Sequence, residues 1–195
     1  MRTIILASTS PRRKELLEQI GLEFKAVPAK YDEDLTGHID PEQIVKTFSF
    51  EKAASLKHDY PDALIIGADT IVFIDGTVYG KPLSLDEAKT MVRTLCGRTH
   101  TVYTGLTIID SAHGHSETVV CKTDIELAEL TDTNIDTYFE KVPPLDKAGA
   151  YAIQGLGGTF TKSITGEYTN VVGLPICALT QTLKKFGIDL LDNNS

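Results

Sequence analysis

Residues 5–22 read ILASTSPRRKELLEQIGL and combine a strand, a tight turn and a helix in one short stretch. The apolar run from Thr3 to Ala7 predicts a buried strand. Ser10 and Pro11 then supply an N-cap and a first helical residue, and Gly21 is typical of a helix end. A strand that leads through a short polar turn into a helix favours a mixed α/β fold.

Arg12 and Arg13 stand in the first turn of this predicted helix, where cations oppose the helix dipole by about 0.3–1 kcal/mol. Free backbone N–H groups at a helix N-terminus favour a bound anion, and paired guanidinium groups can bind phosphate oxygens bidentately. The stretch is therefore compatible with a phosphate site or with a solvated basic face.

The 195-residue chain carries a formal net charge of −8. This charge repels nucleic acid and anionic membranes, so we expect neither as a partner, and an anionic ligand requires a local cluster of cations. Three widely separated cysteines without zinc-site spacing favour free thiols in a reducing compartment. No signal peptide or membrane-spanning run is recognisable, which predicts a cytoplasmic protein. Without repeats or linkers, we expect residues 1–195 to form one domain.

Patterns downstream predict alternating helices and strands. Two helices begin with capping-box signals, at Asp40 with Gln43 and at Ser84 with Glu87. The expected helices are residues 40–56, 84–95, 131–141 and 175–186. The expected strands are residues 23–28, 99–109 and 116–127, the last two paired antiparallel, with short strands in a glycine-rich loop at 150–164.

Residues 63–82 read ALIIGADTIVFIDGTVYGKP and contain two β-branched runs separated by Gly67–Asp69. We expect a break there that exposes Asp69 and Thr70, followed by a hairpin turn at Asp75–Gly76. A carboxylate among isoleucines is unfavourable to bury without a metal, a cation or hydrogen-bond donors, which makes Asp69 a candidate functional residue. A turn aspartate bonded to its own backbone is the alternative.

Two further loops carry polar side chains among small residues. Gly80–Pro82 reads GKP, in which Lys81 either binds a ligand or is solvated, and no Walker A motif is present. Residues 146–158 read DKAGAYAIQGLGG, where Lys147 and Gln154 flank a stretch whose backbone can approach a ligand closely. The glycines lack the spacing of a dinucleotide-binding fingerprint, so we expect no Rossmann cofactor.

Eight motifs then occur in one order along nearly the whole chain: SxSPRRxELL at 8–17, DE at 32–33, EKA at 51–53, GADT at 67–70, GKP at 80–82, GRTHxVxTG at 97–105, DKAGAYxIQG at 146–155 and GLP at 173–175. Together they resemble the Maf family. The resemblance implies a nucleoside triphosphate pyrophosphatase with a divalent metal cofactor, commonly a homodimer. It also implies a mixed-sheet, two-lobed fold like that of the inosine triphosphatases, with a central cleft.

The resemblance further distinguishes two branches of the family, one similar to dTTP/UTP pyrophosphatases and one acting on 7-methyl-GTP. The positions that separate the two branches match Arg12, Thr70 and Gln154, and at all three this chain has the residue typical of the dTTP/UTP branch. Thr47 and Phe48 depart from the leucine and alanine more usual in the family, which affects local packing only.

We therefore predict that Glu33 and Asp69 hold Mg²⁺ or Mn²⁺ and that Asp69 orients or deprotonates the attacking water. Neutral and cationic side chains are expected to bind the phosphates: Ser8, Arg13, Lys52 and Lys81. The Gln154 amide can pair with both N3–H and O4 of uracil or thymine, while Arg12 donates to the other carbonyl or to a phosphate.

No residue obliges the site to exclude dUTP, so we expect dTTP, UTP and dUTP as substrates. A regulatory protein that senses a nucleotide in cell division or septum formation is the competing hypothesis. Such a binder has little use for two carboxylates beside a triphosphate, because they repel it unless a metal intervenes.

Overall fold

The computed structural model describes residues 2–34 and 40–192. The strands in these residues form one mixed sheet in the order β2-β1-β3-β5-β6-β7, with β4 paired to β3. β1 is parallel to β2 and β3, and the other pairs are antiparallel. The strands are β1 Ile4–Ala7, β2 Lys25–Val27, β3 Leu64–Ile74, β4 Thr77–Tyr79, β5 Thr99–Asp110, β6 Ser116–Leu127 and β7 Thr161–Gly166. The predicted mixed α/β fold is confirmed.

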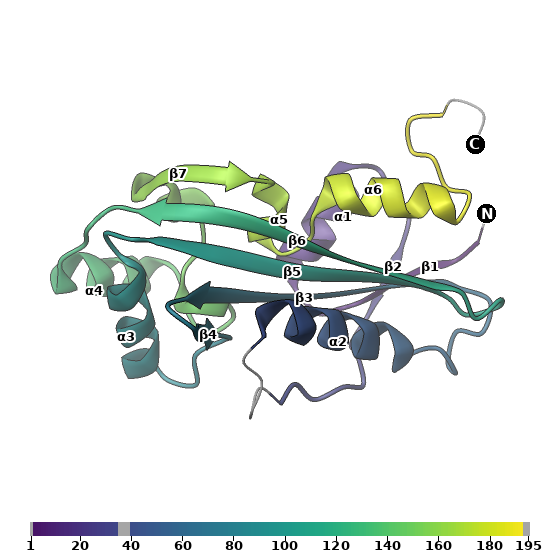
Figure 1. Ribbon diagram of the computed structural model, residues 1–195, viewed down its shortest axis with the longest axis horizontal. Helices are drawn as coiled ribbons and strands as arrows, with labels where there is room; N and C mark the ends of the chain where they lie inside the picture. Colours follow the sequence, from purple (N-terminus) through teal and green to yellow (C-terminus); the bar gives the residue numbers. More distant parts are fainter. Residues whose placement is uncertain (1, 35–39, 193–195) are drawn as a thin grey trace.

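Helices cover both faces of the sheet. In Figure 1, α2 lies against one face of the long strands, and α1 and α6 lie against the other. The helices are α1 Pro11–Gln19, α2 Pro41–Ala54, α3 Leu85–Leu95, α4 Asp132–Lys141, α5 Tyr168–Val172 and α6 Ile176–Lys185, with 3-10 turns η1 Ala148–Ala150 and η2 Gly155–Thr159. Within the described residues, no helix has the length and apolar character that a membrane crossing requires.

Local chemistry accounts for several element boundaries. Asp40 caps α2, since its Oδ1 accepts from the backbone N–H of Glu42 at 3.0 Å and of Gln43 at 3.4 Å. At the end of β3, Asp75 and Gly76 have φ of 51° and 78°, the left-handed pair that a two-residue hairpin turn requires. The predicted hairpin is therefore confirmed.

The predicted break in β3 is wrong. β3 runs without interruption through Gly67, and its pairing with β5 stays in register along this stretch. A Cβ on Gly67 would lie 2.1 Å from Ser49 O, and a Cβ on Gly105 would lie 2.0 Å from Val45 O. Both glycines are thus sites where the α2 backbone approaches the sheet closely, and neither ends a strand.

The predicted short strands near residue 150 are also wrong, apart from β7. Gly149 and Ala150 have φ of 67° and 64°, and two successive left-handed residues cannot continue a strand. A Cβ on Gly149 would lie 2.9 Å from Val72 Cγ2, so the tight turn packs directly on β3.

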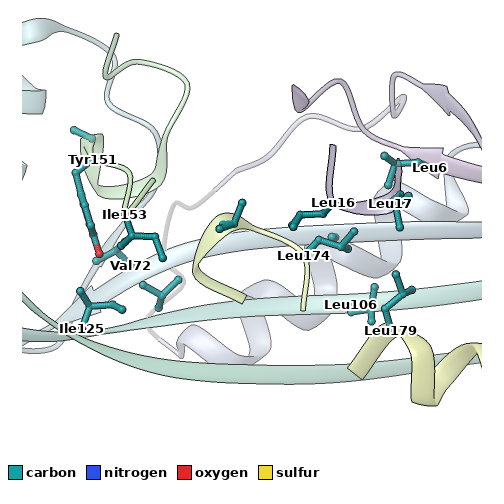
Figure 2. Close-up of a cluster of buried hydrophobic side chains, with 14 of the residues drawn as sticks. Leu6, Leu16, Leu17, Val72, Leu106, Ile125, Tyr151, Ile153, Leu174 and Leu179 are labelled. Carbon is teal, nitrogen blue, oxygen red and sulfur yellow. The ribbon is translucent and has the colours of Figure 1, made fainter. Parts of the chain in front are cut away.

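The main apolar core lies on the face opposite α2 and joins β-strands to α1, α3, α6 and the 150–160 segment. Figure 2 draws part of it, in which strands contribute Leu6 and Leu106 and helices contribute Leu17 and Leu179. Smaller clusters between α2 and the sheet contain Ile65 and Ile71. Different apolar clusters therefore pack against the two faces of β3, and this packing fixes the orientation of the polar residues on that strand.

Candidate active site

A cavity of about 430 Å³ opens at one edge of β3. On this edge β1 pairs with β3 up to Ile66 and β4 pairs from Val72 onward. In the described part of the chain, no strand pairs with residues 67–71 on this edge. Ser8 directly follows the carboxyl end of β1 and lines the cavity. Carboxyl ends of strands next to an interrupted sheet edge are common places for ligand sites in α/β proteins.

All nine residues that the sequence singled out line this one cavity: Ser8, Arg12, Arg13, Glu33, Lys52, Asp69, Thr70, Lys81 and Gln154. They come from segments spread between the end of β1 and the start of η2. The fold thus brings the complete predicted set together, while the chemical role of each residue stays a prediction.

Lys52 lies between the two acidic residues. Its Nζ donates to Asp69 Oδ1 at 2.5 Å and to Glu33 Oε1 at 2.6 Å. Lys52 and Asp69 are buried, with 8% and 4% of their surface exposed, whereas the Glu33 side chain is 37% exposed. The ammonium therefore compensates a carboxylate that would be unfavourable to bury alone.

The charge environment keeps Glu33 ionised. Partial burial by itself raises the pKa of Glu33, but attraction and a hydrogen bond from Lys52, with further attraction from Lys81 and Arg13, hold the net pKa below its ordinary value. Lys81 is exposed at the cavity rim. Cations from several segments of the chain therefore act together to lower the pKa of Glu33.

The two carboxylates fit the predicted divalent metal. Asp69 Oδ2 is buried and has no hydrogen-bond partner among the described residues, which leaves an oxygen ligand available. No group of three or more His, Cys, Asp or Glu side chains in metal-binding arrangement occurs in residues 2–34 and 40–192. Mg²⁺ is commonly held by one or two carboxylates together with water and substrate phosphate, so two protein ligands suffice.

Arg13 is anchored at the base of the cavity. Its Nε donates to Gly173 O at 2.8 Å, its Nη1 to Ser8 Oγ at 3.3 Å and its Nη2 to Thr70 Oγ1 at 3.2 Å. Burial lowers the pKa of Arg13, and the negative charges of Asp69 and Glu33 oppose that shift. Three of its five N–H groups are used inside the protein, so two remain for a ligand.

Asp146 is a cavity residue that the sequence reasoning did not select. Arg12 donates through Nη1 to Asp146 Oδ2 at 2.7 Å and through Nη2 to Asp146 O at 2.9 Å. Lys147 Nζ lies 2.5 Å from Asp146 Oδ1 and 2.7 Å from Pro143 O. The sequence shows Asp146 and Lys147 as neighbouring charges. It does not show the partner of Asp146, because Arg12 lies 134 residues away.

Gln154 stands half-buried at the start of η2, on the same wall as Ala152 and Ile153. Within the described residues its side-chain amide makes no hydrogen bond of the kind that would fix its orientation. Tyr31 and Phe48 form part of another wall, with ring centroids 5.7 Å apart in an edge-to-face arrangement. The cavity therefore combines a charged region with apolar walls that can contact a ring.

Asp69 and Thr70 reach the cavity from opposite faces of β3. Asp69 faces α2 and bonds to Lys52, and Thr70 faces α1 and bonds to Arg13. Both can line one cavity because β3 has its interrupted edge at this point.

The fold and the site define an α/β protein whose cleft balances two carboxylates against several guanidinium and ammonium groups, a combination suited to a metal-bound polyphosphate. The sequence model of the family described as Maf-like protein matches residues 3–186. The chain belongs to this family.

Two relatives are similar over nearly their full lengths. The dTTP/UTP pyrophosphatase of Bacillus cereus (strain B4264) is 45% identical over 190 residues, which cover 97% of this chain and 98% of the relative. The dTTP/UTP pyrophosphatase of Pelotomaculum thermopropionicum is 44% identical over 191 residues, which cover 98% of this chain and all of the relative, at 100%.

Among solved structures, the Staphylococcus aureus Ham1 protein resembles this chain with a TM-score of 0.51. Their sequences are 14% identical over an alignment that covers 95% of this chain and 100% of Ham1. At this identity the likeness concerns the fold alone. It supports the architecture expected from the sequence, a mixed sheet of the inosine-triphosphatase type.

Proposed function

We propose that this protein is a nucleoside triphosphate pyrophosphatase that hydrolyses dTTP and UTP, and also dUTP, to the nucleoside monophosphate and pyrophosphate. The single observation that carries the proposal is the position of Lys52 between Glu33 and Asp69, beside Arg13. The names of the two relatives support the same activity toward dTTP and UTP.

The chain's own donors are suited to the crowded negative charge of a triphosphate. Lys52 has three N–H donors and uses two of them on Glu33 and Asp69, so the third can reach a phosphate oxygen. Ser8 Oγ accepts from Arg13 and from the backbone N–H of Ser10, which leaves its proton as a donor to phosphate. Lys81 adds positive charge at the rim.

Asp69 is the proposed base that orients or deprotonates the attacking water. Its Oδ1 is held by Lys52, whereas its Oδ2 has no partner among residues 2–34 and 40–192 and can accept a proton or bind a cation. The Mg²⁺ or Mn²⁺ ion, held by Glu33 and Asp69, supplies Lewis-acid neutralisation of the phosphate oxygens when bound. Attack on the bond between the α and β phosphates is the proposed step, because it yields the nucleoside monophosphate and pyrophosphate.

Gln154 and Arg12 are proposed to recognise the base. The amide oxygen can accept from N3–H of uracil or thymine while the amide N–H₂ donates to O4. Two of the five Arg12 donors are engaged by Asp146, so the others are available to a base carbonyl or a phosphate.

Pyrophosphate release from a nucleotide panel tests the function. Purified protein is assayed with dTTP, UTP, dUTP, CTP, dGTP and 7-methyl-GTP, each with Mg²⁺, with Mn²⁺ and with EDTA. We expect metal-dependent release that is fastest for the uracil and thymine nucleotides. Binding of dTTP without release would favour the nucleotide-sensing regulatory role, and sedimentation of the same sample tests the expected homodimer.

A further inference from the structure

A chain of hydrogen bonds links the cavity to the backbone of α5. Arg13 Nη2 lies 3.2 Å from Thr70 Oγ1, which lies 3.0 Å from Thr104 Oγ1. Thr104 Oγ1 in turn lies 3.0 Å from Asn170 O. Thr70 and Thr104 are direct cross-strand partners on β3 and β5, and Thr104 is 0% exposed and outside the cavity wall.

The chemistry of the two ends fixes the direction of this chain. A guanidinium group only donates and a backbone carbonyl only accepts. Thr70 Oγ1 therefore accepts from Arg13, Thr104 donates to Asn170 O, and the Thr70 proton points to Thr104. A weaker acceptor for the Thr70 proton, Gly173 O at 3.5 Å, also belongs to the protein, so both arrangements keep this proton away from a ligand.

We propose that Thr104 is a positioning residue for substrate selection, which acts by holding Thr70 as a pure hydrogen-bond acceptor toward the cavity. Thr70 then favours a ligand group that carries N–H or O–H and disfavours one that offers only a lone pair. This inference rests on the proposed function. In dTTP the groups that carry such a proton are the thymine N3–H, which the proposed function pairs with Gln154, and the sugar 3′-hydroxyl.

Thr104→Val tests the inference because it removes the hydroxyl while keeping the branched shape. Thr70 then loses its acceptor on β5 and keeps only the longer contact of 3.5 Å to Gly173 O, which is too weak to hold its O–H away from the ligand. We expect kcat/KM for dTTP to fall roughly tenfold, the size of one lost hydrogen bond to a polar group. Thr104→Ser keeps the hydroxyl and should stay within about threefold of wild type on the same scale.

Thr107→Val is the matched control. Thr107 is also a fully buried threonine of β5, and its hydroxyl bonds to Ser49 and Thr118, both at 2.9 Å, outside the cavity wall. It should lower thermal stability as much as Thr104→Val does and leave kcat/KM for dTTP nearly unchanged. Equal kinetic losses in the two valine variants would overturn the proposal.

Two analogues distinguish the possible ligand groups. N3-methyl-dTTP lacks the ring donor, and 2′,3′-dideoxy-TTP lacks the sugar donor. The penalty of Thr104→Val should disappear with the analogue that lacks the group bound by Thr70 and persist with the other. The same penalty on dTTP and on both analogues would contradict the inference.

The proposed function can fail separately. If wild-type protein binds dTTP but releases no pyrophosphate, the enzymatic proposal is wrong. The dissociation constants of dTTP and the two analogues, measured by calorimetry for the same variants, then test Thr104 in the same way. Selectivity that depends on the Thr104 hydroxyl would uphold the inference for a binding protein, and its absence would overturn it.

Discussion

Lys52 Nζ and Asp69 Oδ1 lie 2.5 Å apart, one on α2 and the other on β3. The contact depends on glycines that let the α2 backbone lie almost against the sheet, at Gly67 and Gly105. Only a short separation between helix and sheet allows the lysine ammonium to reach the carboxylate. The absence of a side chain at these two glycines therefore determines both how α2 packs and whether Lys52 reaches Asp69.

Asp69→Asn should abolish pyrophosphate release while sparing the fold, because an amide cannot take the proton of water and is a poorer cation ligand. Asp75→Asn changes an exposed aspartate in the hairpin turn that follows the same strand and should keep near-normal activity. Steady-state release of pyrophosphate and the thermal midpoint of both variants provide the comparison. More than a tenth of the wild-type rate in the Asp69 variant would remove this residue from the proposed role.

Gly67→Ala should displace α2, since the new Cβ would otherwise lie 2.1 Å from Ser49 O. We expect a loss of about 1–3 kcal/mol in the free energy of unfolding, which is typical of overpacking. Activity should fall as well, because Lys52 moves with the helix.

Gly158→Ala is a suitable control for this variant, because the nearest atom to its added Cβ is Ile153 O at 3.5 Å, an ordinary contact. Urea unfolding and pyrophosphate release measured on both variants separate the two cases. Wild-type stability of the Gly67 variant would show that the helix can relax without consequence.

Gln154→Glu should weaken turnover of dTTP and UTP more than it changes the metal requirement. The carboxylate loses the N–H₂ donor and adds negative charge near the nucleotide. The measurements are kcat/KM for each nucleotide of the panel and the Mg²⁺ concentration that gives half-maximal activity. An equal loss with every triphosphate would contradict a role in reading the base.

His100 should make folding stability depend on pH. Burial lowers its pKa to about 4, and its Nε2 lies 2.5 Å from the hydroxyl of buried Tyr151. Below its ordinary pKa of about 6.5 the unfolded chain binds a proton that the folded chain excludes. Stability should therefore decrease as pH falls from about 6.5 to about 4, by up to about 3 kcal/mol.

Urea unfolding at pH 7 and at pH 4.5 measures this dependence, with His100→Gln as the test variant. The difference between the two pH values should be smaller in His100→Gln than in wild type. His58→Gln, at an exposed position of the chain, should retain the wild-type difference. An unchanged difference in the His100 variant would exclude this histidine as the source.

The first turn and the hairpin were predictable because their signals are local. Pro11 begins α1 and Asp75–Gly76 adopts the left-handed turn from conformational preferences that neighbours do not override. Ser10 occupies the N-cap position but makes no side-chain capping bond, and its backbone N–H donates to Ser8 Oγ. Local pattern thus placed the helix start but not the hydrogen bonds around it.

The errors have a common physical origin in long-range packing. Gly67–Asp69 has the composition of a break, yet α2 packs on it and Lys52 neutralises the aspartate, so the strand continues. Asp146 was missed because its partner Arg12 is distant in sequence. The short helix α5 was missed as well, since five residues are too few for a periodic pattern. The candidate site residues were selected because whole motifs resemble those of the family. Such motifs include residues that pair across the fold, which a local pattern does not reveal.

Successive side chains of β3 point to opposite faces of the sheet, which separates hydrolysis from the choice of nucleotide in the proposed enzyme. A rigid peptide unit holds the acid on one side of the sheet and the threonine on the other, each supported by different neighbours. Substitutions on the threonine side can therefore change which nucleotide is accepted while the hydrolytic side stays intact. Such independence lets the substrate range diverge among descendants of one scaffold without rebuilding the machinery that breaks the anhydride.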